Sequence, residues 1–296
     1  MPMKLKNLIY IAAFLFVAKV SIGQTFGVRA GLNYSTFLGP VEPSDDVDES
    51  FGYSNGFHFG LSYAYDFTDI FSVRSELLYI QNGTTQSHYG DAFYIIRWNG
   101  NTRIEKGDLE YDLNISNAYL SVPVMVNFRV SRKWEIFGGP YLNILIGPTG
   151  RGKLRFESYD RPDEITFRQS LDYNYNSDNV REITGSSPSA VDQIGIIIDG
   201  EEVALNRFAG AYTTQGERTG NKFNFLDAGI TAGAHYFLNN GFFIGFQVDY
   251  GFLDLTNNDV DFSLKDVNLD NPDNPFIFSD DKDTHLGIHT SFGFRF

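Results

Sequence analysis

The chain has 296 residues, a formal net charge of −14 and no cysteine, and aromatic residues make up 16% of it. An acidic surface repels nucleic acid, and a chain without cysteine has no disulfide and no thiolate metal site. The many phenylalanines, tyrosines and glycines, with a mean hydropathy of only −0.22, suit alternating strands and do not suit helical membrane spans. Composition leaves a soluble all-β protein and a membrane β-barrel as alternatives.

Residues 1–23 are predicted to be a secretory signal peptide. Lys4 and Lys6 precede an apolar run, 8–18, that is too short to span a bilayer. Ser21 and Gly23 place small residues at the two positions that determine cleavage. A buried amino-terminal helix is the alternative interpretation. We therefore expect an exported mature chain, residues 24–296.

Eight later segments alternate apolar and polar side chains with a period of two, which indicates strands with one apolar face and one polar face. They are residues 25–36, 57–67, 71–81, 117–130, 134–146, 225–237, 242–252 and 285–296. The sequence Gly138-Gly139-Pro140 predicts a bulge or a bend in the fifth segment.

The connections between these segments alternate between long and short. The long ones are predicted as polar loops at about 37–55, 82–113, 147–222 and 255–284, and Asn99-Gly100 in the second predicts a two-residue hairpin turn. Residues 194–198 (IGIII) in the third predict a short strand above the barrel. Long loops at one end and short turns at the other are typical of outer-membrane barrels, and a soluble sandwich has no reason for this asymmetry. The sequence therefore predicts an all-β fold, an eight-stranded antiparallel transmembrane β-barrel in the cell outer membrane.

Four motifs of the chain resemble, in their order, the PorT-like outer-membrane β-barrels of Bacteroidota-type Gram-negative bacteria. They are residues 26–33 (FGVRAGLN), 119–123 (YLSVP), 139–142 (GPYL) and 227–229 (DAG). The resemblance implies a barrel fold without catalytic residues, and it links the family's namesake to a protein-secretion and gliding system. It also implies that the last strand carries the carboxyl-terminal signature read by the outer-membrane assembly machinery, formed by Phe292, Phe294 and Phe296.

The interior of an eight-stranded barrel is just wide enough for side chains. Strand parity directs nine charged or titratable side chains inward, namely Arg29, Arg74, Glu76, Arg129, Asp227, His235, Asp249, His289 and Arg295. Buried charges must pair, so we predict a polar network that plugs the lumen, with Arg295 beside Arg29 and Glu76. A gated or proton-linked path is the alternative. Phe292, Phe294 and Phe296 take the opposite parity and should face lipid.

Catalysis receives little support from the sequence. Asp227 and His235 lie on one strand face, ~26 Å apart at the rise of a strand, and cannot form a dyad. Asp249 and His289 could pair, but no inward serine is clearly placed beside them as a nucleophile. We therefore predict no catalytic residue, no cofactor and no metal.

The last long loop offers a possible metal site. Its carboxylates could bind Ca²⁺, although their spacing matches no EF-hand and a solvated acidic loop is the simpler interpretation. These carboxylates are Asp270, Asp273, Asp280, Asp281 and Asp283.

The function predicted from the sequence is that of a non-enzymatic outer-membrane barrel. It contacts outer-membrane lipid, is inserted by the assembly machinery, and binds a partner through its loops or supports an envelope or secretion complex. An outer-membrane lipid-modifying enzyme and a small channel are the alternatives.

Overall fold

The computed structural model describes residues 23–40, 47–177, 193–213, 220–260, 264–268, 276–278 and 280–296. All but the last residue of the predicted signal peptide, and Asp270 and Asp273 of the acidic loop, lie outside these ranges. Within them, no helix is both long and apolar enough to cross a membrane.

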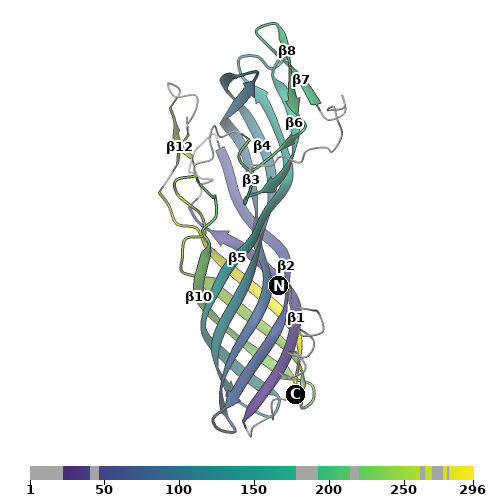
Figure 1. Cartoon of the computed structure of the whole chain (residues 1–296), viewed down its shortest axis with the longest axis vertical. Helices are drawn as coiled ribbons and strands as arrows, with labels where there is room; N and C mark the ends of the chain where they lie inside the picture. Colours follow the sequence, from purple (N-terminus) through teal and green to yellow (C-terminus); the bar gives the residue numbers. More distant parts are fainter. Residues whose placement is uncertain are drawn as a thin grey trace, which may run out of the picture.

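Eight strands close into a ring, which confirms the predicted barrel (Figure 1). They are β1 (Gln24–Leu38), β2 (Val47–Asp66), β3 (Phe71–Trp98), β4 (Asn101–Arg129), β5 (Trp134–Ser158), β10 (Leu226–Phe237), β11 (Phe242–Gly251) and β14 (Thr284–Arg295). Every neighbouring pair is antiparallel, β5 pairs with β10, and β14 closes the ring on β1. The short turns all lie at one end of the ring.

Side chains of opposite character occupy the two faces of the barrel wall. Outward residues are apolar and exposed, for example Leu32 at 68% and Leu61 at 61%. Phe292, Phe294 and Phe296 also point outward, with exposures of 59%, 43% and 57%. An exposed belt of this kind is stable only against lipid, and the chain is an outer-membrane barrel protein.

The long strands exchange their polar and apolar faces where they leave the membrane. In the lower half of β4, Val122 and Val124 are exposed on the outer face. In its upper half, Leu113 and Ile115 are buried on the inner face, and Asp112 lies on the outer face. Water replaces lipid outside the strand at this level, so the apolar residues turn inward.

Most of the described residues in the segments predicted as the first three loops are strand, and in the first of them residues 47–55 belong to β2. Residues 82–113 continue β3 and β4 into one long hairpin, and its predicted turn at Asn99-Gly100 is confirmed, with positive φ angles of 46° and 82°. Residues 147–222 include the end of β5 and four further strands, β6 (Thr166–Asn174), β7 (Gln193–Ile198), β8 (Glu201–Asn206) and β9 (Phe208–Ala209). The strand predicted at residues 194–198 is confirmed as part of β7. The loop prediction was wrong for the other strand residues because the search required an apolar outer face, and that face is polar above the membrane.

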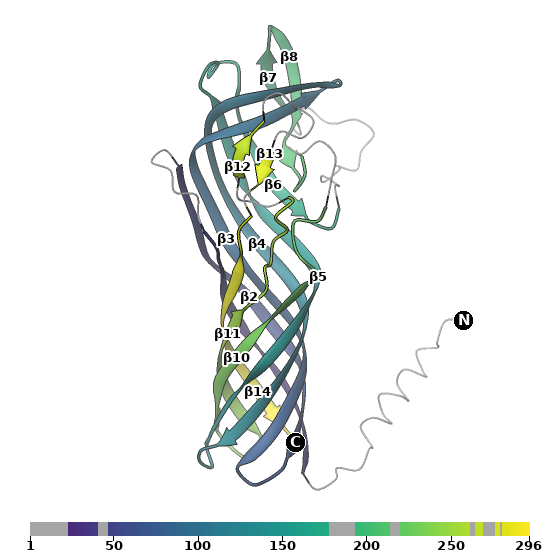
Figure 2. The same cartoon turned by 90° about the vertical axis from the view of Figure 1, so that its left-hand side faces the viewer.

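The outer end of the molecule is an open sheet (Figure 2). Strands β2 to β5 continue upward, β6 pairs with β5, and the β7–β8 hairpin lies at the tip. We call this part the outer sheet. A short hairpin of β12 (Leu264–Val267) and β13 (Phe276–Phe278) lies within the predicted fourth loop.

Of the bulge or bend predicted at Gly138-Gly139-Pro140, the bulge is contradicted by the strand pairing. The pairing of β5 with β4 and with β10 keeps one register through these residues. The register instead shifts between Ala118 and Tyr119, opposite the step from Leu145 to Gly147. This bulge lies where the strands leave the membrane.

The two faces of β14 allow a test of the membrane assignment. We expect Ile288→Arg, nearer the midplane, to destabilise the folded barrel by about 2–4 kcal/mol, and Phe294→Arg, near the periplasmic boundary, by about 0–1 kcal/mol. Folding into lipid vesicles, followed by heat-modifiable gel mobility, measures both. A larger effect of Phe294→Arg than of Ile288→Arg would contradict the assignment.

Candidate functional site

The periplasmic half of the lumen is organised around Glu135 on β5, whose side chain is 1% exposed. Its carboxylate accepts two hydrogen bonds from Arg295, at 2.7 and 3.0 Å, and a longer one from Arg74 at 3.4 Å. Nδ1 of His235 lies 3.5 Å from the same carboxylate and 3.0 Å from the Arg74 guanidinium. One acid on one strand therefore holds groups from β3, β10 and β14.

A second acid, Glu76 on β3, pairs with Arg29 and shares Arg74 with Glu135. Its carboxylate lies 2.8 Å from Arg29 and 3.1 Å from Arg74. Arg29 also donates to Gln247 at 2.8 Å, and Gln247 donates to Asp249 at 2.8 Å. Gln247 thus links the periplasmic half of the lumen to a higher layer.

The higher layer is built on Asp249 and His289, which the sequence had suggested as a pair. Nε2 of His289 lies 3.0 Å from Oδ2 of Asp249. Oδ1 of Asn33 is 2.8 Å from Nδ1 of His289 and 2.6 Å from Nδ1 of His58. All four side chains belong to buried residues.

Asp227 forms a third group near the outer end of the barrel. Oδ2 of Asp227 lies 3.2 Å from Nδ1 of His285, and Asn143 donates to Asp227 at 2.8 Å. Asp227 and His235 have separate partners, as their spacing required. His285 was absent from the predicted set, although it has the same strand parity as His289 and Arg295, and this parity was the signal that could have identified it.

Of the nine predicted lumen residues, Arg129 alone lies outside these contacts. It is exposed at the end of β4 and donates to the carbonyl of Asp69 in the adjoining short turn, at 2.9 Å. Arg295 does point inward, but its partner is Glu135 rather than Glu76. Glu135 has inward parity, and this parity was the signal that could have identified it. We call the side chains of the three groups together the lumen network.

The lumen is tightly filled beside this network. A Cβ atom added to Gly287 would lie 2.7 Å from Nε2 of His289. The His289 ring is fixed between Asn33 and Asp249 and has little freedom to move away. An alanine at position 287 therefore disturbs the network even though it is small.

A separate apolar core, which we call the outer core, lies above the barrel in the outer sheet. Buried side chains from the sheet meet buried side chains from the β7–β8 hairpin, among them Ile115, Leu154, Phe156, Phe167, Ile196, Ile198, Val203 and Leu205. Burial of apolar side chains is the main driving force of folding, so a core of this size stabilises the outer sheet as a folded unit. The outer part of the protein is therefore a structured platform.

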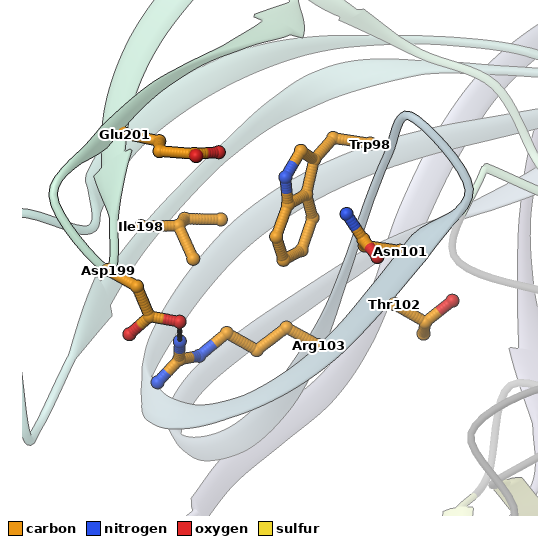
Figure 3. A pocket seen from close by; sticks show the side chains of 7 residues that line it. All are labelled: Trp98, Asn101, Thr102, Arg103, Ile198, Asp199 and Glu201. Carbon is orange, nitrogen blue, oxygen red and sulfur yellow. Dashed lines mark hydrogen bonds and ion pairs between the residues drawn. The ribbon is translucent and has the colours of Figure 1, made fainter.

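A cavity of about 450 Å³ opens at the tip of the platform, between the turn of the β3–β4 hairpin and the turn of the β7–β8 hairpin (Figure 3). Its lining is Trp98, Asn101, Thr102, Arg103, Ile198, Asp199 and Glu201. Asp199 accepts hydrogen bonds from Arg161 at 2.8 Å and from Arg103 at 2.9 Å, and these bonds lower the pKa of its carboxyl. We call it the tip cavity.

Carboxylates also gather at the outer rim of the barrel, around Asp283. Burial raises the pKa of Asp283 to about 6, against the opposing hydrogen bond from Thr256, and the nearby Asp281, Asp254 and Glu49 raise it further. Among the described residues, no three histidine, cysteine or acidic side chains are placed to hold a metal ion.

The closed ring, the lipid-facing belt and the paired charges inside define an outer-membrane β-barrel protein. The chain belongs to the family of the outer membrane protein beta-barrel domain, whose sequence profile matches residues 21–257. No curated protein matches the chain.

Several solved structures are similar to the chain. Ail, the attachment invasion locus protein of Yersinia pestis, is 12% identical, with 93% of this chain and 100% of that one covered and a TM-score of 0.35. OprG of Pseudomonas aeruginosa is 11% identical, with coverages of 93% and 96% and a TM-score of 0.36. The outer membrane protease OmpT of Escherichia coli is 10% identical, with coverages of 94% and 99% and a TM-score of 0.30. These values are too low to transfer a function.

Removing the charge of Glu135 tests the lumen network. Glu135→Gln leaves Arg74 and Arg295 without their shared counter-charge in the lumen, and we expect a loss of about 3–5 kcal/mol in the free energy of unfolding. Glu157→Gln is the matched control on the same strand, because Glu157 pairs with Arg155 at the surface and should contribute less than about 1 kcal/mol. Urea unfolding of the barrel in vesicles measures both. Equal effects would contradict a structural role for the network.

The shifted Asp283 predicts a pH dependence of stability. The pKa in the folded protein, about 6, is above the ordinary value of 3.8, so the folded protein retains a proton that the unfolded chain has released. Stability should therefore be greatest below about pH 4 and fall by about 3 kcal/mol in all as the pH rises through about 6. Unfolding measured across this range should show a flatter slope in Asp283→Asn and an unchanged slope in Asp280→Asn. An unchanged slope in Asp283→Asn would contradict this assignment.

Proposed function

We propose that this protein is a non-enzymatic outer-membrane barrel whose lumen is closed by ion pairs and whose platform binds a protein partner of the cell envelope. The observation that carries the proposal is an open strand edge on the folded outer sheet. Within the described residues, Val47 to Tyr53 of β2 pair with β3 on one side only, because β1 leaves β2 after the pair Ser35–Ser54.

The lumen network supports the closed-lumen part of the proposal. Its groups reach across the barrel axis from β1, β3, β5, β10, β11 and β14, and their contacts occupy both halves of the lumen. Moving an ion or a solute past them requires breaking pairs that are shielded from water, which costs several kcal/mol for each charge. A closed structural plug is therefore favoured over a small channel.

The burial of the Asp249–His289 pair supports the non-enzymatic part. The side chains of His289 and Asp249 are 2% and 7% exposed, and both hold structural contacts with Asn33, Thr231 or Gln247. A lipid-modifying enzyme needs a nucleophile and base that a lipid substrate can reach. This pair lacks that access, so we favour a structural role for it.

The open edge of β2 is suited to strand addition. An unpaired edge exposes backbone N–H and C=O groups, and a partner strand can bind them while side-chain contacts supply specificity. Asp48 and Glu49 make this edge acidic, which favours a partner strand with basic residues. The resemblance to PorT-like barrels agrees with such a role, and we propose that the partner belongs to an envelope or secretion complex.

A site-specific photo-crosslinker distinguishes the open edge from the rest of the outer sheet. Ser50 on β2 and Lys153 on β5 lie in one row of the sheet, joined through Ser87 and Asp112, and both are exposed. We expect a crosslinker at position 50 to capture an envelope protein in native membranes. The same group at position 153, between two paired strands, should capture none. Equal capture at both positions, or capture at 153 alone, would contradict docking at the edge.

A further inference from the structure

The tip cavity has the composition of a ligand site rather than of a packing gap. Trp98 is half-buried, rests against the outer core and lines the cavity, while Asn101 and Thr102 lie on one side of it and Glu201 on the other (Figure 3). Its volume of about 450 Å³ lies within the roughly 300–1,000 Å³ usual for small-molecule sites. Such sites join an aromatic surface to a few converging polar groups.

The framework of the cavity is rigid. The turns Asn99-Gly100 and Asp199-Gly200 each carry two positive φ angles, which is the geometry of tight hairpins. Arg103 joins one hairpin to the other through its bond with Asp199, and its bond with Glu105 orients it from below. The two sides of the cavity are therefore held at a set separation before any ligand arrives.

The polar groups that face the cavity are not used by the fold. Among the described residues, the side chains of Asn101, Thr102 and Glu201 and the indole N–H of Trp98 have no hydrogen-bond or ion-pair partner. Together they present an amide, a hydroxyl, a carboxylate and an N–H around one aromatic ring. Such a set can both donate to and accept from the hydroxyl groups of a ligand.

The charges around the cavity disfavour an anionic ligand. Among the described residues, Glu201 lines the cavity without an ion-pair partner, whereas Arg103 is paired with Glu105 and Asp199. Asp199 is already neutralised by Arg103 and Arg161. The other lining groups are the face of the Trp98 ring and the hydrogen-bonding side chains around it. The face of an aromatic ring packs well against weakly positive C–H groups of a ligand.

We propose that the tip cavity is a binding site for a neutral saccharide, with a sugar ring on Trp98 and its hydroxyl groups bonded to Asn101, Thr102 and Glu201. The cavity lies at the outermost end of the platform, at the end of the molecule opposite the short turns (Figures 1 and 2). The site does not depend on the protein partner proposed above, because the open edge of β2 is a different surface.

Intrinsic fluorescence of the full-length protein tests this proposal directly. The chain has two tryptophans, and Trp134 lies at the other end of the barrel, so Trp134→Phe leaves Trp98 as the sole reporter. The protein is held in a detergent without a sugar head group and titrated with soluble tetrasaccharides of glucose, galactose, mannose and N-acetylglucosamine. We expect at least one to change the Trp98 emission saturably, with a Kd of about 10 µM to 1 mM, typical of a small polar site.

Variants separate a specific site from nonspecific contact. In the protein that retains Trp134, calorimetry should give binding about tenfold weaker or more for Trp98→Ala and for Glu201→Gln. Glu202→Gln is the matched control, since it removes the same charge from the next residue of β8, outside the cavity lining, and binding should be unchanged. Gel mobility checks that each variant folds.

Three results would overturn the proposal. The first is that no tetrasaccharide binds below about 10 mM, weaker than a useful small-ligand site. The second is that binding survives Trp98→Ala. The third is that choline or inorganic phosphate binds at Trp98 in place of any saccharide, which would make the cavity an ion site. None of these results bears on crosslinking at Ser50, so the two proposals fail separately.

Discussion

In the hydrocarbon core of a bilayer, no water is present to bond the backbone, so every N–H and C=O group of a spanning segment needs a partner in the protein. This requirement is met here by closing the sheet, which places β14 beside β1 in one unbroken register from Gly27–Arg295 to Leu38–Thr284. Because side chains alternate along a strand, the same register decides which residues face lipid and which face the lumen. The belt of exposed Leu and Phe and the buried charges are two consequences of that closure.

Closure creates a narrow interior that the protein fills with charge. Each acid there serves several groups, Glu135 most of all, and the contacts join strands that are not neighbours in the sheet. Arg295 of β14 reaches Glu135 of β5 across the axis, and Arg29 of β1 reaches Gln247 of β11 past β14. The lumen network therefore braces the ring across its diameter, where the backbone ladder cannot act.

Above the membrane the backbone no longer needs a partner within the protein for every N–H and C=O group, and the architecture changes accordingly. Water can satisfy a free strand edge, so the sheet opens and β2 leaves the partner that it has within the barrel. Water also reverses the preference of the two faces, and the inner face becomes the apolar one. The result is a folded platform on a lipid-embedded ring, with an open edge on one side and a rigid cavity at the tip.

The sequence by itself determined the membrane barrel, because alternation is a local pattern and each strand is stabilised separately when its apolar face lies against lipid. It also indicated the turn at Asn99-Gly100, the inward parity of Arg29, Arg74 and Glu76, and the pairing of Asp249 with His289. The tertiary structure alone decided that Glu135 meets Arg295, since residues 160 apart come together only when the ring closes. It alone decided the outer core as well: Phe156 and Ile196 become buried in one cluster only when the outer sheet and the β7–β8 hairpin pack together, and a local strand pattern does not say what a strand packs against.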